Sequence, residues 1–127
     1  MTEPPLRIEI KPLKQALDEF VDVIEAAKAG KHVEPSRVLS FDSVDDFRKF
    51  FTEKRLEMLR VIRHKQPHSV YELAKMLKRD LKSVNTDLDI LIDIGVVSVK
   101  RKKAKTRTGY KKVPSVDFGR LVFEMVV

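Results

Sequence analysis

The chain has 127 residues, and its 26 basic and 19 acidic side chains give a formal net charge of +7 and a pI near 9.7. A chain of this length is expected to form one domain, with room for an extension. The absence of cysteine excludes disulfides and thiolate catalysis, and it fits the reducing cytoplasm that we expect as the location. No run of about 18 apolar residues occurs, so no membrane span is expected. The pI permits nucleic acid, an acidic membrane surface or an acidic protein as partner, and of these we do not expect a membrane.

The first 51 residues predict an N-terminal extension. The expected elements are a short strand over 7–10, a helix over 12–29, a short strand over 38–41 and a helix over 44–51. Pro12 fits the first turn of the long helix, where its missing N–H is not needed, and Gly30 supplies its end. We expect this extension to serve in dimerisation or to cover the core.

The long N-terminal helix carries an apolar seam, in which residues recur at steps of four and three. Its members are Leu13, Leu17, Phe20, Ile24 and Ala27. This period is typical of a helix that packs on another helix. The seam either covers the chain's own core or forms a homodimer interface. Because two heptads are too few for an independent coiled coil, such an interface needs further contacts.

Residues 52–118 predict three helices followed by a β-hairpin. The helices are expected over about 53–65, from Ser69 to about Leu77 and over 81–94, with strands at 96–99 and 113–118 and a hairpin tip at Thr108 and Gly109. Thr52 and the Ser69-x-x-Glu72 capping box begin the first two helices, and Gly95 ends the third. Residues 119–127 predict a separate apolar strand, either buried on both faces or exposed as a partner-binding edge.

The charge of the chain is concentrated in one segment. Eight of the thirteen residues from 100 to 112 are basic and none is acidic; they are Lys100, Arg101, Lys102, Lys103, Lys105, Arg107, Lys111 and Lys112. The rest of the chain holds 18 basic and 19 acidic residues. Concentrated charge of one sign favours a polyanionic partner, and the neighbouring pair of helices favours nucleic acid.

The helix over 81–94 is the predicted recognition helix. With Val84, Leu88 and Leu91 turned inward, the 100° step leaves polar residues on the outer side; the candidates for DNA contact are Lys82, Ser83, Asn85 and Thr86. Asn85 has the donor–acceptor pair that reads adenine in a bidentate manner, whereas the hydroxyls contact phosphate or base. Asp87 is expected to be structural, since an unpaired acid here would repel phosphate.

Residues 36–118 also carry a pattern of short motifs. They are Leu39-Ser40-Phe41, Thr52-x-x-Arg55-Leu56, Tyr71-Glu72-Leu73-Ala74, Arg79-Asp80, Val84, Asp87-Leu88, Leu91 and Gly95-Val96-Val97. The pattern resembles MarR/ArsR-type winged helix–turn–helix regulators, closest to small prokaryotic, largely archaeal, DNA-binding regulators with an N-terminal helical extension. The resemblance implies DNA binding as a dimer, and some such relatives resemble antitoxins or autoregulators. The metal sensing of ArsR members does not carry over, because the chain has no cysteine.

The expected fold class is therefore α+β, mainly α: a winged helix–turn–helix with a three-helix core, a β-hairpin wing and a helical N-terminal extension. The expected function is sequence-specific binding of double-stranded DNA by a homodimeric transcriptional repressor or autoregulator. Two alternatives stay open, namely a non-specific nucleic-acid or chromatin-architectural protein, and an antitoxin-like module that binds another protein as well as DNA. No catalytic group or cofactor is expected, because no Ser/His/Asp order and no Gly-rich phosphate loop occurs. No metal site is expected either, since Pro67 separates His64 from His68.

Overall fold

The computed structural model describes residues 3–32, 37–105, 107 and 109–127. Within this part, the chain forms two compact units. The first unit consists of the residues up to Lys49 together with Phe118–Val127, and the second consists of Phe50–Asp117. None of the described helices is long and apolar enough to cross a membrane.

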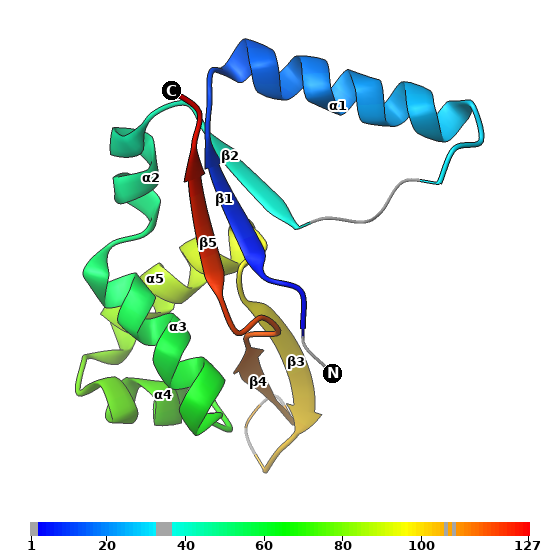
Figure 1. Ribbon diagram of the computed structural model, residues 1–127. Helices are drawn as coiled ribbons and strands as arrows, with labels where there is room; N and C mark the ends of the chain where they lie inside the picture. Colours follow the sequence, from blue (N-terminus) through cyan, green and yellow to red (C-terminus); the bar gives the residue numbers. More distant parts are fainter. Residues whose placement is uncertain (1–2, 33–36, 106, 108) are drawn as a thin grey trace. The chain divides into compact units, whose positions relative to one another are not determined.

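Among the described residues, a parallel sheet of three strands forms the centre of the first unit (Figure 1). Its strands are β1 (Leu6–Ile10), β2 (Val38–Phe41) and β5 (Leu121–Met125), in the order β2-β1-β5. The register runs from Arg7↔Val38 to Ile10↔Phe41 on one side of β1 and from Leu6↔Leu121 to Ile10↔Met125 on the other. Segments from both ends of the chain therefore meet in one sheet.

One face of this sheet is apolar. Alternate residues of a strand project to the same side, and so do residues directly opposite each other in neighbouring strands. Leu6, Ile8 and Ile10 of β1 are all at most 5% exposed. Helix α2 (Val44–Phe50) contributes to this face through Phe47, whose ring lies edge-on to Phe41 of β2 and Phe123 of β5, with centroids 5.9 and 5.1 Å away. The aromatic contacts hold α2 against the sheet.

Helix α1 (Leu13–Lys28) follows β1 and is joined to the sheet by polar contacts. The buried ammonium group of Lys11 pairs with Glu19 and Glu9, and these hydrogen bonds raise the pKa of Lys11. Asp42, just after β2, accepts a hydrogen bond from the backbone N–H of Leu13 at 3.1 Å. The remainder of α1 extends away from the strands (Figure 1), and none of its 16 residues, all of them described, is buried.

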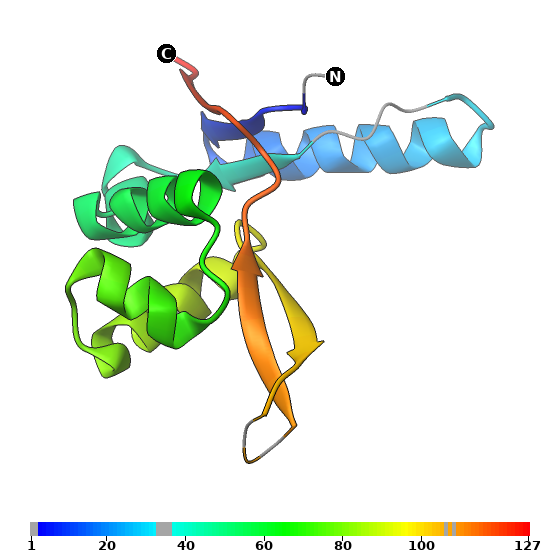
Figure 2. The ribbon, with the colours of Figure 1, turned by 90° about the horizontal axis from the view of Figure 1, so that it is seen from below.

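The described residues of the second unit form three helices and an antiparallel hairpin, which projects beyond the helices as a twisted ribbon (Figure 2). The elements are α3 (Glu53–Lys65), α4 (Val70–Leu77), α5 (Leu81–Asp93), β3 (Ser98–Lys103) and β4 (Tyr110–Ser115). Their common core includes Met58, Leu59, Ile62, Leu73, Ala74, Val84, Leu88, Leu91, Val96 and Val97. The side chains of Thr52, Ser69 and Asp80 cap the three helices. These caps confirm the helix starts expected from the sequence.

Asp87 of α5 connects the helices of the second unit. Its Oδ1 accepts a hydrogen bond from Nε of Arg55 on α3 at 3.0 Å, and its Oδ2 accepts one from Nη2 of Arg79, in the α4–α5 turn, at 2.6 Å. The three side chains are only 13–18% exposed. Burial alone would raise the pKa of Asp87, but the two guanidinium groups outweigh it and hold the pKa below its ordinary value. We call these three residues the Asp87 clamp.

The fold class expected from the sequence, a mainly α winged helix–turn–helix with a helical extension, is wrong. The described chain has five helices and five strands, which form one parallel and one antiparallel sheet. The N-terminal part is not a purely helical extension, since β1 and β2 build the sheet together with β5. Local periodicity indicates a strand near 7–10, but it contains no information that this strand pairs with residues more than a hundred positions later.

Of the two interpretations of the C-terminal strand, burial on both faces is wrong, and an exposed edge is what the structure has. β5 lies at the edge of the sheet, and its side chains Leu121, Phe123 and Met125 are 37–48% exposed. The hairpin strands are shifted as well: β3 begins at Ser98, after the buried pair Val96 and Val97, and β4 begins at Tyr110. The basic segment therefore lies largely within the strands and not only in the loop between them.

We expect Asp87→Asn to destabilise the second unit by about 3 kcal/mol, because it leaves two nearly buried guanidinium groups without a counter-charge. Urea unfolding followed by tyrosine fluorescence reports on this unit, since Tyr71 and Tyr110 both lie in it. Asp93→Asn, at the exposed end of the same helix, is the matched control and should change stability by less than about 0.5 kcal/mol. Equal, small effects of the two variants would contradict the clamp.

The clamp also predicts how stability depends on pH. The pKa of Asp87 lies below its ordinary value of 3.8 in the folded protein, so the stability that the clamp contributes is fully present above about pH 4 and is lost as the pH falls through the folded pKa. The difference in unfolding free energy between wild type and Asp87→Asn should therefore shrink below about pH 4. A difference that stays constant down to about pH 2 would count against this assignment.

Candidate nucleic-acid interface

The turn between α4 and α5 fixes the first turn of α5. Lys78 ends α4 in the left-handed conformation, with φ of 54°. Asp80 then caps α5, because its carboxylate accepts hydrogen bonds from the backbone N–H and the hydroxyl of Ser83, each at 2.8 Å. These hydrogen bonds, that from the backbone N–H first, lower the pKa of Asp80. The start of α5 is thus held by its cap and by the adjoining Asp87 clamp.

Of the four residues of α5 predicted to contact DNA, two already use their side-chain hydroxyls in hydrogen bonds within the protein. Lys82 and Asn85 are exposed. The hydroxyl of Ser83 donates to Asp80, and the hydroxyl of Thr86 donates to the backbone carbonyl of Lys82 at 3.0 Å. In this arrangement Ser83 belongs to the helix cap, and Thr86 offers an external ligand only an acceptor. Lys82 and Asn85 are the predicted residues whose side chains bring donors to the surface of α5.

The register of the hairpin divides its cations between two faces, because antiparallel partners project to the same side of the ribbon. On one side Lys100 pairs with Val113 and Lys102 pairs with Lys111. On the other side Arg101 pairs with Lys112 and Lys103 pairs with Tyr110. We call the first the Lys100 face and the second the Arg101 face. A segment that reads as one basic run is therefore two differently directed surfaces.

The Arg101 face borders α5 at a hollow of about 280 Å³. The polar lining consists of Asn85 and Asp89 from α5 with Arg101 and Lys112 from the hairpin, and the apolar lining consists of Val70, Leu88, Ile92 and Val99. The fold thus brings three of the predicted DNA-contacting residues to one place from three separate elements. An amide beside two cations is a combination suited to a base edge next to phosphates. Asp89 opposes the cations and disfavours a phosphate at its own position.

The other six predicted wing residues do not line this hollow; Lys103 lies on the Arg101 face and Lys111 lies on the Lys100 face. Lys100 and Lys102 line a separate cavity on the Lys100 face. Lys105 lines an open hollow near the end of the hairpin together with Gly109, whose φ is 77°, and Arg107 is exposed. Thr108, the other residue of the predicted tip, lies outside the described residues. The eight cations are therefore not gathered on one surface.

Tyr110 is a candidate contact that the sequence-based prediction missed. It lies on the Arg101 face, is 54% exposed and lines a small hollow with Arg101, Lys111 and Lys112. An aromatic ring among cations can stack on a base, while its hydroxyl can bond to phosphate. The pattern that points to it is an aromatic residue within a basic run.

The apolar seam of α1, predicted as a dimer interface, is exposed in the first unit. Leu13, Leu17, Phe20 and Ile24 are 62%, 54%, 62% and 38% exposed, and Ala27 is also exposed. At 100° per residue, the acidic residues of the helix lie on the opposite side; they are Asp18, Glu19, Asp22 and Glu25. α1 is therefore an amphipathic helix whose apolar side remains accessible in the described structure.

The part of the chain that matches a known protein family is mainly the second unit. A family model described as HVO_A0114 matches residues 50–122, which is more than half of the chain and includes all the elements from α3 to β4. No curated protein matches the chain. The chain therefore belongs to the HVO_A0114 family.

Proposed function

We propose that this protein binds double-stranded DNA and regulates transcription, as a sequence-specific homodimeric repressor or autoregulator. In this proposal α5 enters the major groove, and the Arg101 face of the hairpin lies on the neighbouring backbone or minor groove. The observation that carries it is the hollow shared by Asn85, Arg101 and Lys112. There, the side chain suited to reading adenine adjoins two cations suited to phosphate.

The distribution of charge between the two units supports a polyanionic partner for the second. Residues 50–117 contain 17 basic and 8 acidic side chains, a net charge of +9, whereas the rest of the chain carries 9 basic and 11 acidic ones. The positive potential therefore belongs to the unit that contains α5 and the hairpin. Such a charge steers a polyanion toward this unit and makes binding dependent on salt.

The proposal predicts different effects for a base-reading residue and for phosphate-contacting residues. Asn85→Ala should weaken binding to a selected site by about 1–3 kcal/mol and leave binding to random duplex unchanged, because only a base contact is lost. The double variant Arg101→Gln/Lys112→Gln should weaken binding to both duplexes and reduce the slope of log K against log salt by about two units. Fluorescence anisotropy at several salt concentrations measures all of these effects.

The matched controls lie outside the proposed surface. Asp93→Ala changes the exposed end of the same helix, and Lys14→Gln/Lys28→Gln removes two charges from α1. Neither should alter site preference or reduce the salt slope by more than a fraction of a unit. If the α1 variant and the hairpin variant lowered the slope equally, the binding would reflect net charge and not the proposed surface.

One observation favours the alternative of non-specific nucleic-acid binding. The hydroxyls of Ser83 and Thr86 are engaged within the helix, and Asp89 lies in the hollow, so few groups remain for reading bases. The ratio of affinities for a selected site and for random duplex at one salt concentration separates the two functions. A ratio near one indicates non-specific binding, and a ratio of about a thousand or more indicates a site-specific regulator.

The exposed seam of α1 supports a second copy of this chain as its partner. A two-fold axis brings two identical apolar seams together, and a symmetric dimer matches an inverted repeat in DNA. We expect sedimentation equilibrium to show a dimer for the wild type and a monomer for Leu17→Asp, with Asp22→Asn on the opposite side of α1 as the control. A wild-type monomer that associates only with a different chain would support the antitoxin-like alternative and contradict the homodimer.

A further inference from the structure

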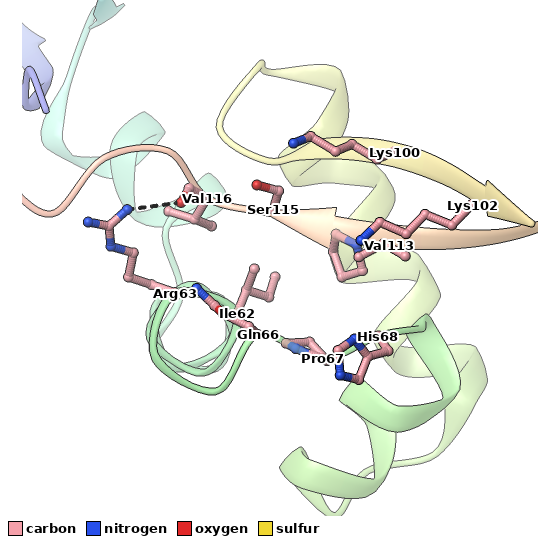
Figure 3. A pocket seen from close by; sticks show the side chains of 11 residues that line it. Ile62, Arg63, Gln66, Pro67, His68, Lys100, Lys102, Val113, Ser115 and Val116 are labelled. Carbon is pink, nitrogen blue, oxygen red and sulfur yellow. Dashed lines mark hydrogen bonds between the residues drawn. The ribbon is translucent and has the colours of Figure 1, made fainter.

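The Lys100 face of the hairpin borders a second cavity, distinct from the proposed DNA surface. This cavity has a volume of about 280 Å³ and lies between the hairpin and the end of α3 with the turn that follows it (Figure 3). Its polar lining consists of Arg63, Gln66, His68, Lys100, Lys102 and Ser115. We call it the hairpin–α3 cavity.

The charges that line this cavity have one sign. Lys100 and Lys102 come from β3 and Arg63 comes from α3, while none of the lining residues, all within the described part of the chain, is acidic. Figure 3 shows both lysine side chains lying along the hairpin above Val113 and Ser115, with His68 on the facing turn. The lysines are two positions apart in one strand, so their side chains leave the strand on the same side. This arrangement selects for an anion.

The wall opposite the lysines is held in place by packing and by backbone geometry. Ile62 and Pro67 are buried, and Gln66 ends α3 in the left-handed conformation with φ of 48°. Nη1 of Arg63 donates a hydrogen bond to the backbone carbonyl of Val116, 3.3 Å away, which joins the end of α3 to the segment after β4. The cavity is therefore bounded by fixed elements, as preformed ligand sites are.

We propose that the hairpin–α3 cavity binds the phosphate group of a small phosphate ester. The two lysines supply the positive charge for a dianion, and the side chains of Gln66 and Ser115 add hydrogen-bond donors, whereas the Arg63 guanidinium is engaged with the Val116 carbonyl. Apolar lining residues such as Ile62 and Val113 suit the organic part of the ester. The volume lies near the lower limit for small-molecule sites, which favours a compact ligand.

The same phosphate chemistry is present in the backbone of DNA, so the test has to separate the two sources. The cavity involves the Lys100 face, whereas the proposed DNA surface involves the Arg101 face. Phosphate binding is therefore measured without DNA, and its failure would leave the proposed DNA binding unaffected. Phenyl phosphate is the probe, with benzenesulfonate as the monoanion and phenol as the uncharged analogue.

We expect phenyl phosphate to shift the amide resonances of Gln66 and His68 saturably in physiological salt, and to bind at least about tenfold more tightly than benzenesulfonate. Lys100→Gln/Lys102→Gln should weaken this binding about tenfold or more. Arg101→Gln/Lys103→Gln removes the same charge from the opposite face of the same strand and should change it less than about twofold. Thermal melting confirms that each variant is folded. The single variant Lys102→Glu tests the same cavity independently, and it should also weaken the binding of phenyl phosphate.

Three results would overturn the proposal. Equal losses in the two double variants would indicate general charge attraction. Equal affinity for benzenesulfonate and phenyl phosphate would exclude selection for a dianion. Absence of phenyl phosphate binding, together with weaker duplex binding by Lys100→Gln/Lys102→Gln, would assign these lysines to the DNA backbone.

Discussion

The position of α5 depends on one carboxylate held between two guanidinium groups. Asp87 is bound by Arg55 from α3 and by Arg79 from the preceding turn, at 3.0 and 2.6 Å. The clamp ties α5 to α3 and makes an acid compatible with a helix that we propose to lie on DNA, because its charge is neutralised inside the unit. Hydrophobic packing of Val84, Leu88 and Leu91 holds the helix in the core, and the ion pairs join it to α3 and to the preceding turn.

Strand register determines which cations of the basic segment share a face. Alternation along β3 sends Arg101 and Lys103 to one side and Lys100 and Lys102 to the other. One basic segment can therefore serve two anionic ligands: a duplex along α5 and the Arg101 face, and a small phosphate ester in the hairpin–α3 cavity. A shift of one residue in this register would exchange the two sets of cations.

The sequence predicts local features of this protein well and long-range features poorly. The starts of α3 and α4 follow from the predicted caps Thr52 and Ser69, which act within three residues, whereas the cap of α5, Asp80, is expected only as part of a turn. The Arg79–Asp87 contact is also within reach of sequence reasoning, but Arg55 lies 32 residues before its partner. The pairing of β1 with β5 leaves no trace in local periodicity, and for this reason the expected fold class is wrong. The proposed sites show the same limit, since composition reveals the basic segment but only strand pairing reveals its two faces.

The central claim is that Asn85 and Arg101 bind one duplex together. Asn85 is the only asparagine in the chain, so selective labelling of asparagine marks its side-chain amide alone in the NMR spectrum. During titration with a selected duplex, we expect this signal and the Nε–H signal of Arg101 to shift together and to saturate at the same stoichiometry. If both signals remained unchanged when the protein is saturated with duplex, the proposed surface would be wrong.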